Sequence, residues 1–91
     1  MVLGIAYDLH NPGRDYNDVI AAIKTARSYT HPQGSLWLVD TDIEPADWRD
    51  KLKAAGDPND EYFIFRLAKH WASLNIDSDA ATWLKSASRT W

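Results

Sequence analysis

Hydrophobic and polar residues alternate with a period of two in three segments of the chain, residues 2–9, 35–41 and 61–67. This alternation is typical of β-strands that bury one face. In the first segment, one side carries the bulky residues Leu3, Ile5, Tyr7 and Leu9, and the other carries Val2, Gly4, Ala6 and Asp8. The bulky side predicts contact with a core. The small side predicts close approach by another backbone or subunit, since Gly and Ala leave room for one.

Between these strands, apolar residues recur at the spacing of an α-helix. Residues 15–28 predict a first helix, with Asp15 as its N-cap and Val19, Ile20 and Ile23 toward the sheet. The pattern of residues 45–55 predicts a second helix, which begins at Pro45 and ends before Gly56. Residues 28–31 predict a short extra strand that forms a hairpin with 35–41. A final helix is expected from Asp77 or Ser78 onward, as a C-terminal tail.

The order strand, helix, strand pair, helix, strand predicts an α+β fold of the ferredoxin-like βαββαβ type. This is an antiparallel sheet with two helices on one face, here followed by the helical tail. At 91 residues the chain is long enough for a single domain, residues 1–91. The opposite sheet face then needs a cover. We expect a homodimer formed through that face, with the tail, about residues 69–91, contributing to the interface.

Composition narrows the classes of function. The chain has no Cys, which excludes disulfides and thiolate metal sites and favours a cytoplasmic location. No apolar run approaches the roughly 20 residues that a membrane-spanning helix needs, so no membrane association is expected. The net charge of −3 argues against a protein that coats nucleic acid, although a local basic patch stays open.

Short motifs give the chain a family resemblance. Tyr7-Asp8 at the end of the first strand, Trp37-Leu38-Val39 before the second helix, and Asp60 before the last strand resemble the small ferredoxin-fold CRISPR-associated protein that forms the dimeric core of spacer-acquisition complexes. The Tyr-Asp-Leu strand end and Trp71-Ala72-Ser73 are similar to an uncharacterised bacterial branch of such proteins, sometimes labelled SinR-like. The resemblance covers most of residues 2–85. It implies that Asp8 faces the same residue of a second subunit and that the pair holds a divalent metal for phosphodiester cleavage, although several family members are structural.

Asp8 and His10 are therefore the candidate catalytic residues, and Asp8 is the candidate metal ligand. Paired carboxylates with ordered water suit Mg²⁺, or Mn²⁺ in its place. His10, two residues further on, is placed to donate a proton or to orient a metal ligand. The alternative is structural: Asp8 caps the following turn through Asn11. His31 and His70 show no metal-binding spacing with His10 and are expected at the surface.

Two other clusters favour structural interpretations. The acidic run Asp40, Asp42 and Glu44 lacks the glycine and distal glutamate of a calcium loop and indicates a helix start instead. Trp71, Trp83 and Trp91, with Trp37 and Trp48, could stack on nucleic-acid bases while Arg14, Lys24, Arg27, Lys69 and Arg89 contact phosphates. The basic residues do not alternate with the aromatic ones, which favours tryptophans that anchor a core or an interface.

Two functions of different classes remain. The sequence favours a small homodimeric module, not itself catalytic, that assembles or regulates a nucleic-acid-processing complex, with a protein partner left open. The alternative is a Mg-dependent phosphodiesterase, an RNase or DNase, that uses Asp8 across the dimer interface. Only one acidic residue and little basic surface support catalysis, so the enzyme interpretation ranks second.

Overall fold

The structure is a computed structural model that describes residues 1–10 and 16–91. Along the chain it contains β1 (Val2–Asp8), α1 (Asn17–Ile23), β2 (Ser28–Gln33), β3 (Leu36–Asp40), α2 (Pro45–Ala55), β4 (Glu61–Leu67) and α3 (Ser78–Lys85). Most of the predicted turn after β1, the predicted N-cap Asp15 and the proposed cap of Asp8 through Asn11 lie outside the described residues.

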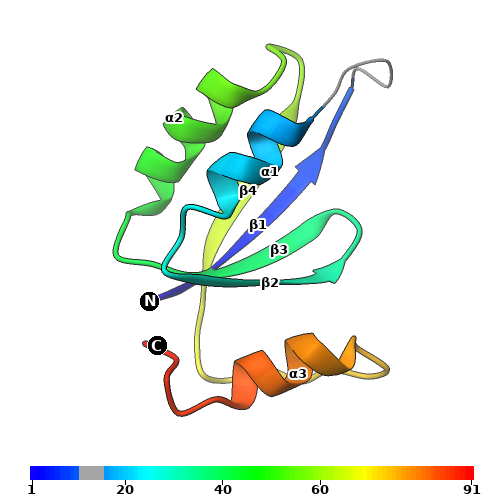
Figure 1. Ribbon diagram of the computed structural model, residues 1–91, viewed down its shortest axis with the longest axis vertical. Coiled ribbons are helices and arrows are strands. Elements are labelled where there is room, and N and C mark those ends of the chain that lie inside the picture. The colour runs from blue at the N-terminus through cyan, green and yellow to red at the C-terminus, as the bar shows by residue number, and fades with distance from the viewer. Residues whose placement is uncertain (11–15) are drawn as a thin grey trace.

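The four strands form one antiparallel sheet in the order β2-β3-β1-β4. Helices α1 and α2 cover one face of this sheet, and α3 lies beyond the opposite face (Figure 1). The predicted ferredoxin-like α+β fold with an added C-terminal helix is therefore confirmed. The interior positions of β1 and β3 in this order explain why these two strands contain mainly apolar and buried residues.

The core lies between the sheet and the two helices. Leu3 and Ile5 on β1 are fully buried, and they pack with Trp48 and Leu52, which are the buried stripe of α2. The rest of this cluster consists of Val19, Ile23, Trp37 and Val39. The bulky face of the first strand thus contacts the core as predicted, and α2 has the predicted bounds.

The small face of β1 is filled from within the chain. The register pairs Gly4 with Phe65 of β4, and a methyl group added at Gly4 would overlap the Phe65 ring. What approaches Gly4 is therefore an aromatic side chain, not the backbone or second subunit that the sequence suggested. The segment after β4 and α3 then cover the neighbouring part of this face, where Trp71, Ile76 and Leu84 line a gap of about 160 Å³ against Leu38 and Phe65.

The first helix is shorter than its pattern predicted. It ends at Ile23, whereas the apolar spacing predicted a helix as far as residue 28. After Ile23 the amides of Thr25 and Ala26 bond to carbonyls only three residues back, and the Thr25 hydroxyl donates to the Ala22 carbonyl at 2.6 Å. These bonds close the last turn, and Ser28 then pairs with Asp40 as the start of β2.

The short strand predicted at residues 28–31, as one arm of a hairpin, is confirmed as β2. It is two residues longer than predicted and continues through Pro32 to Gln33. A proline fits because β2 is an edge strand and its register with β3 is interrupted between Thr30 and Gln33. The longest helix among the described residues is α2, with 11 residues. None of the described helices is long and apolar enough to cross a bilayer.

Asp40, at the end of β3, joins the C-terminal tail to the sheet. Its side chain is 1% exposed, and its Oδ2 accepts a hydrogen bond from the Thr90 amide at 2.9 Å. The Thr90 hydroxyl donates to Oδ1. The guanidinium groups of Arg27 and Arg89 approach the same carboxylate at 3.4 and 3.6 Å. We call this cluster of Asp40, Arg27, Arg89 and Thr90 the Asp40 clasp.

Burial raises the pKa of Asp40, but the hydrogen bonds from Thr90 and the charge of Arg89 outweigh burial and leave the pKa below its usual value of 3.8. A carboxyl group with a lowered pKa stabilises the fold above the pKa that it has in the unfolded chain. That contribution is lost as the pH falls through the lower pKa of the folded state.

We expect Asp40→Asn to lower the free energy of unfolding by about 3 kcal/mol, because it leaves the buried guanidinium of Arg89 without a counter-charge. Urea unfolding at pH 7 measures this. The matched control is Asp50→Asn, since Asp50 is an exposed acid that pairs only with its neighbour Arg49 among the described residues.

The difference between wild type and Asp40→Asn should shrink as the pH falls from about 4, where Asp40 of the unfolded chain takes up a proton, through the lower pKa of Asp40 in the folded protein. A difference that persists undiminished at pH 2, or an equal effect of Asp50→Asn, would contradict this role for the Asp40 charge.

Candidate functional site

The pairing of β1 with β4 brings two acidic residues together at one end of the sheet. Asp8 is the last residue of β1 and Glu61 is the first of β4, and the antiparallel register places them directly opposite each other. Because side chains alternate along a strand, both lie on the same sheet face as Ala6 and Phe63. Like charges directly opposite in a strand pair repel each other, so this end of the sheet favours a cation.

The imidazole of His10 lies beside this acidic pair. Its Nε2 lies 2.5 Å from Glu61 Oε2 and 3.7 Å from Asp8 Oδ2. Each of the three residues has one atom that could bind a metal, a carboxylate oxygen or a ring nitrogen, and these three atoms lie within 4.8 Å of one another. All three side chains are exposed, with fractions of 74% for Asp8, 43% for His10 and 71% for Glu61. We call these three residues the Asp8–His10–Glu61 cluster.

The carboxylates raise the pKa of His10 above its usual value of 6.5. The hydrogen bond to Glu61 contributes most, desolvation opposes it, and the charges of Asp8, Glu61 and Asp60 add to it. A histidine with a raised pKa stabilises the fold fully below its unfolded pKa, and the contribution is lost as the pH rises through the folded pKa. Protonated His10 thus relieves the repulsion between Asp8 and Glu61 mainly in mildly acidic solution.

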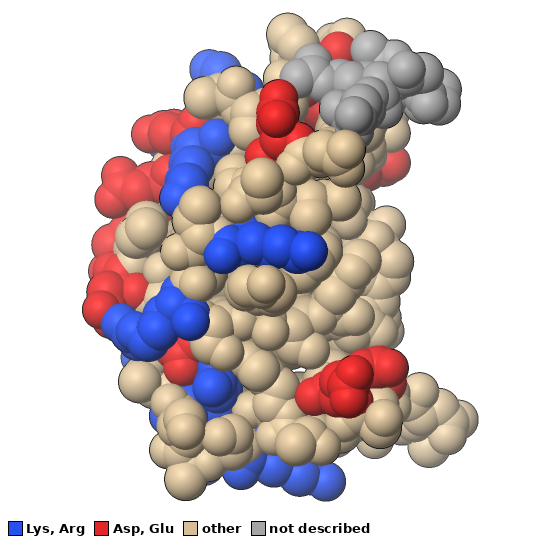
Figure 2. All heavy atoms as spheres, in the orientation of Figure 1, with Lys and Arg blue, Asp and Glu red and all other residues tan. Residues whose placement is uncertain are grey.

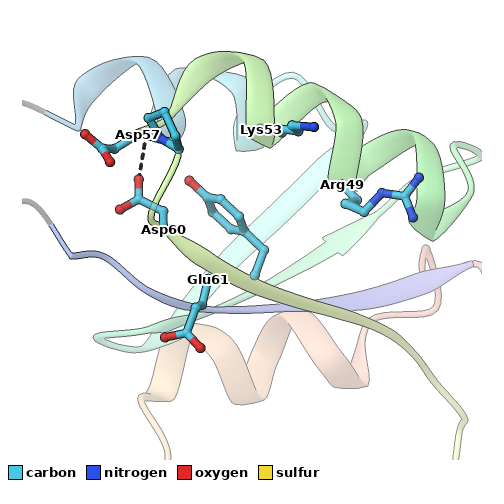
Figure 3. Close-up of a pocket in the computed structure, with 7 residues that line it drawn as sticks. Arg49, Lys53, Asp57, Asp60 and Glu61 are labelled. Atoms are coloured by element: carbon cyan, nitrogen blue, oxygen red, sulfur yellow. Dashed lines mark hydrogen bonds between the residues drawn. The ribbon is translucent and has the colours of Figure 1, made fainter.

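Asp60 fixes the backbone on which the cluster is built. Its Oδ1 accepts hydrogen bonds from the His10 amide at 2.9 Å and from the Tyr16 hydroxyl at 2.8 Å. Its Oδ2 accepts the Asp57 amide at 2.8 Å, the bond drawn in Figure 3. One half-buried side chain therefore connects the end of β1, the start of α1 and the turn before β4. The motif residue Asp60 has a positioning role in this structure.

A hollow lies on the α2 side of β4 at the same end of the sheet. It has a volume of about 400 Å³, and its lining includes Arg49 and Lys53 of α2, Asp57 and Asp60 of the turn between α2 and β4, and Glu61. Figure 3 shows Glu61 pointing away from α2, to the opposite side of β4. The Glu61 carboxylate therefore points away from these two basic residues.

Basic residues do not form a continuous surface over α2. Figure 2 shows Lys and Arg side chains interspersed with Asp and Glu side chains on this part of the molecule, whereas the surface around the β2–β3 hairpin is largely uncharged. A phosphodiester backbone is held by clustered Lys and Arg. The visible face offers no such track beside α2.

The cluster has the chemistry of a divalent cation site. Two carboxylates and one imidazole would supply three ligands and leave positions for water, as in many catalytic metal sites. An imidazole nitrogen suits Mn²⁺ or Zn²⁺ better than Mg²⁺, which prefers oxygen ligands. The residues thus fit a metal, and the added histidine shifts the preferred ion from the predicted Mg²⁺ toward its alternative, Mn²⁺.

The structure brings Asp8 and His10 together and adds Glu61, which the sequence analysis did not select. The alternation in 61–67 marked Glu61 only as a strand start. Its partnership with Asp8 follows once β1 and β4 are known to be antiparallel neighbours, because then the end of one strand must face the start of the other.

The other candidates lie elsewhere. The ring of His31 stacks on Trp37 with centroids 4.0 Å apart, and His70 is exposed after β4, so neither joins His10. Trp37 and Trp48 are core residues, and Trp83 donates a hydrogen bond to Ser28 at 2.7 Å, in agreement with a role as anchors. In the acidic run, Asp42 pairs with Arg27, and Glu44 occupies the N-cap position of α2.

Comparison with known proteins adds no assignment. No family model, no curated protein and no solved structure matches this chain. The function therefore has to be argued from the geometry described above, and the resemblance to the CRISPR-associated family stays a prediction.

We expect Glu61→Gln to lower the pKa of His10, because the amide keeps the shape of the side chain but removes the strongest stabilisation of the imidazolium. Titration of the His10 ring protons by NMR measures the shift. Asp47→Gln, which removes one exposed acidic charge from the first turn of α2, is the control. Equal His10 titration curves for wild type and Glu61→Gln would show that the contact does not exist in solution.

Proposed function

We propose that this protein is a homodimeric module, not itself catalytic, that assembles or regulates a nucleic-acid-processing complex. Its second copy would pack on the part of the sheet face that the tail leaves uncovered. The observation that supports this most directly is Phe63 on β4, a large aromatic side chain that is 70% exposed. The link to nucleic-acid processing comes from the family resemblance.

The surface around Phe63 has the properties of a two-fold contact. The Phe63 ring adjoins that of Phe65, with centroids 5.5 Å apart, and the small residue Ala6 lies directly opposite Phe63 on β1. Ala6, Phe63 and the backbone between them border a shallow hollow of about 310 Å³. In a two-fold contact, the Phe63 ring of each copy can occupy the hollow beside Ala6 of the other. Among the large apolar side chains on the described strands Phe63 is the most exposed, at 70%, followed by Tyr29 of β2 at 40%.

The same contact places the Asp8–His10–Glu61 cluster at the rim of the interface, because Asp8 and Glu61 also border the hollow. Two copies would bring four carboxylates and two histidines near one another. Dimerisation should therefore be stronger when His10 is protonated or when a divalent cation is present, since either reduces the repulsion.

We expect Phe63→Ser to weaken self-association by about tenfold or more, because a single aromatic residue at the centre of an interface often dominates its energy. Sedimentation velocity over roughly 10–100 μM protein, the range of ordinary specific association, measures the change. Ile43→Ser is the matched control. It removes another apolar side chain, which is 39% exposed. Ile43 follows Asp40, at the end of β3 that lies away from Phe63.

A wild-type protein that stays monomeric over this range would refute the proposed dimer. An Ile43→Ser variant that dissociates as readily as Phe63→Ser would place the interface elsewhere.

The second candidate function is a metal-dependent phosphodiesterase, and the Asp8–His10–Glu61 cluster is the specific observation in its favour. In this function Asp8 and Glu61 would hold a divalent cation, and the cation would supply a bound water of lowered pKa. His10 would orient that cation or donate a proton to the leaving oxygen.

For this candidate, Asp8→Asn should abolish cleavage of single- or double-stranded RNA or DNA in Mn²⁺ or Mg²⁺ while leaving the circular dichroism spectrum unchanged. The amide keeps the shape of the side chain but loses the charge that binds a hard cation. Asp50→Asn serves as the control. Equal activity of wild type and Asp8→Asn, including no activity in both, removes Asp8 as a catalytic residue and leaves the assembly module standing.

A further inference from the structure

The C-terminal tail encloses a second site, far from the Asp8–His10–Glu61 cluster. It is a cavity of about 520 Å³ between the segment that follows β4, the end of α3 and the last residues of the chain. Its volume lies in the range of small-molecule sites, roughly 300–1,000 Å³. Nothing in the proposed dimer uses it.

The lining of this cavity combines cations with flat aromatic rings. Lys69, Lys85 and Arg89 supply positive charge, and Trp71 and Trp91 supply two half-buried indole side chains. No Asp or Glu is among the described residues that line it. Neither lysine forms an ion pair with any residue that the structure describes, which leaves both ammonium groups available to an anion.

Arg89 gives the cavity a buried positive wall. Its side chain is only 9% exposed, its guanidinium lies over the Trp83 ring at 4.2 Å, and its nearest carboxylate oxygen, on Asp40, is 3.6 Å away. Its Nε and Nη1 are buried with no hydrogen-bond acceptor in the described chain. The Asp40 carboxylate is also shared with Arg27, so the Asp40 clasp does not fully satisfy the arginine.

Folding, not sequence spacing, brings these residues together. Lys69 and Trp71 follow β4, whereas Lys85 lies at the end of α3 and Trp91 lies beyond it. The Trp91 carbonyl is held by a hydrogen bond from Arg66 of β4, and Thr90 is held by the Asp40 clasp. The last two residues of the chain are thus held against the sheet, which positions the Trp91 side of the cavity.

We propose that this cavity binds an aromatic ligand that carries a phosphate, namely a nucleotide, either free or at the phosphorylated 5′ end of a nucleic-acid strand. The base stacks on the indole of Trp71 or Trp91, and Lys69 and Lys85 contact the phosphate. Stacking on tryptophan tolerates different bases, because every base has an aromatic face. Charge-assisted hydrogen bonds to phosphate supply the selection for an anion.

The test uses the full chain and isothermal titration calorimetry with adenosine 5′-monophosphate. Adenosine and inorganic phosphate, which each carry half of the recognised chemistry, are expected to bind at least about tenfold more weakly. Lys85→Gln and Trp71→Leu should each weaken binding of the nucleotide about tenfold. Lys53→Gln is the matched control, since Lys53 is an exposed lysine of α2 on the other side of the sheet.

A 5′-phosphorylated oligodeoxyadenylate and its 5′-hydroxyl counterpart separate the two ligand sources. Tighter binding of the phosphorylated strand than of the free nucleotide assigns the site to a strand end, and equal or weaker binding assigns it to the free nucleotide.

Absence of nucleotide binding up to millimolar concentration would overturn the proposal. A loss in Lys53→Gln equal to that in Lys85→Gln would also overturn it, because binding would then depend on overall charge. Phe63→Ser should bind the nucleotide as wild type does, so failure of the proposed dimer and failure of this site are separate results.

Discussion

The buried carboxylate of Asp40 is the interaction on which the completed fold depends. It ends β3, and it holds the tail through Thr90 and Arg89 and the turn after α1 through Arg27. A single buried charge is costly unless it is paired and hydrogen-bonded, and here each oxygen has a close hydrogen-bond donor. Without that charge the sheet and its two helices would still share an apolar core. The tail would lose the most buried of its polar attachments to the sheet, while the hydrogen bonds from Arg66 to Trp91 and from Trp83 to Ser28 would remain.

Local patterns were sufficient to predict most of the elements, because the period of the apolar residues and the punctuating Pro45, Gly56 and Asp77 all indicate the same boundaries. They failed where local and long-range interactions compete. Residues 24–28 continue the helical pattern of α1, but pairing of Ser28 with Asp40 in the sheet overrides it. No local signal distinguishes Asp40 from its acidic neighbours Asp42 and Glu44, since only the folded tail buries it.

The residues of the candidate sites likewise differ in how far the sequence alone could predict them. Asp8 and His10 are close in sequence and could be predicted, whereas Glu61 joins them only through the register of β1 and β4. The aromatic and basic residues of the C-terminal cavity do not alternate along the chain, and this argued for anchors. In space, Trp71 and Trp91 do share a cavity with Lys69 and Lys85. Spacing along a chain therefore underestimates sites that are assembled from separate segments.

The two sites lie beyond opposite ends of β4, a strand of seven residues and thus about 20 Å long. The contact between Asp40 and Thr90 also spans 50 residues of sequence. The partners of the tail, Asp40 of β3 and Arg66 of β4, are brought to their places only when the sheet has formed. Docking of the tail is therefore expected as the last step of folding. Local detachment of residues 69–91 would then open the C-terminal cavity without unfolding the sheet. A ligand bound in the cavity would make this opening rarer, and the Asp8–His10–Glu61 cluster at the other end of β4 would keep its shape.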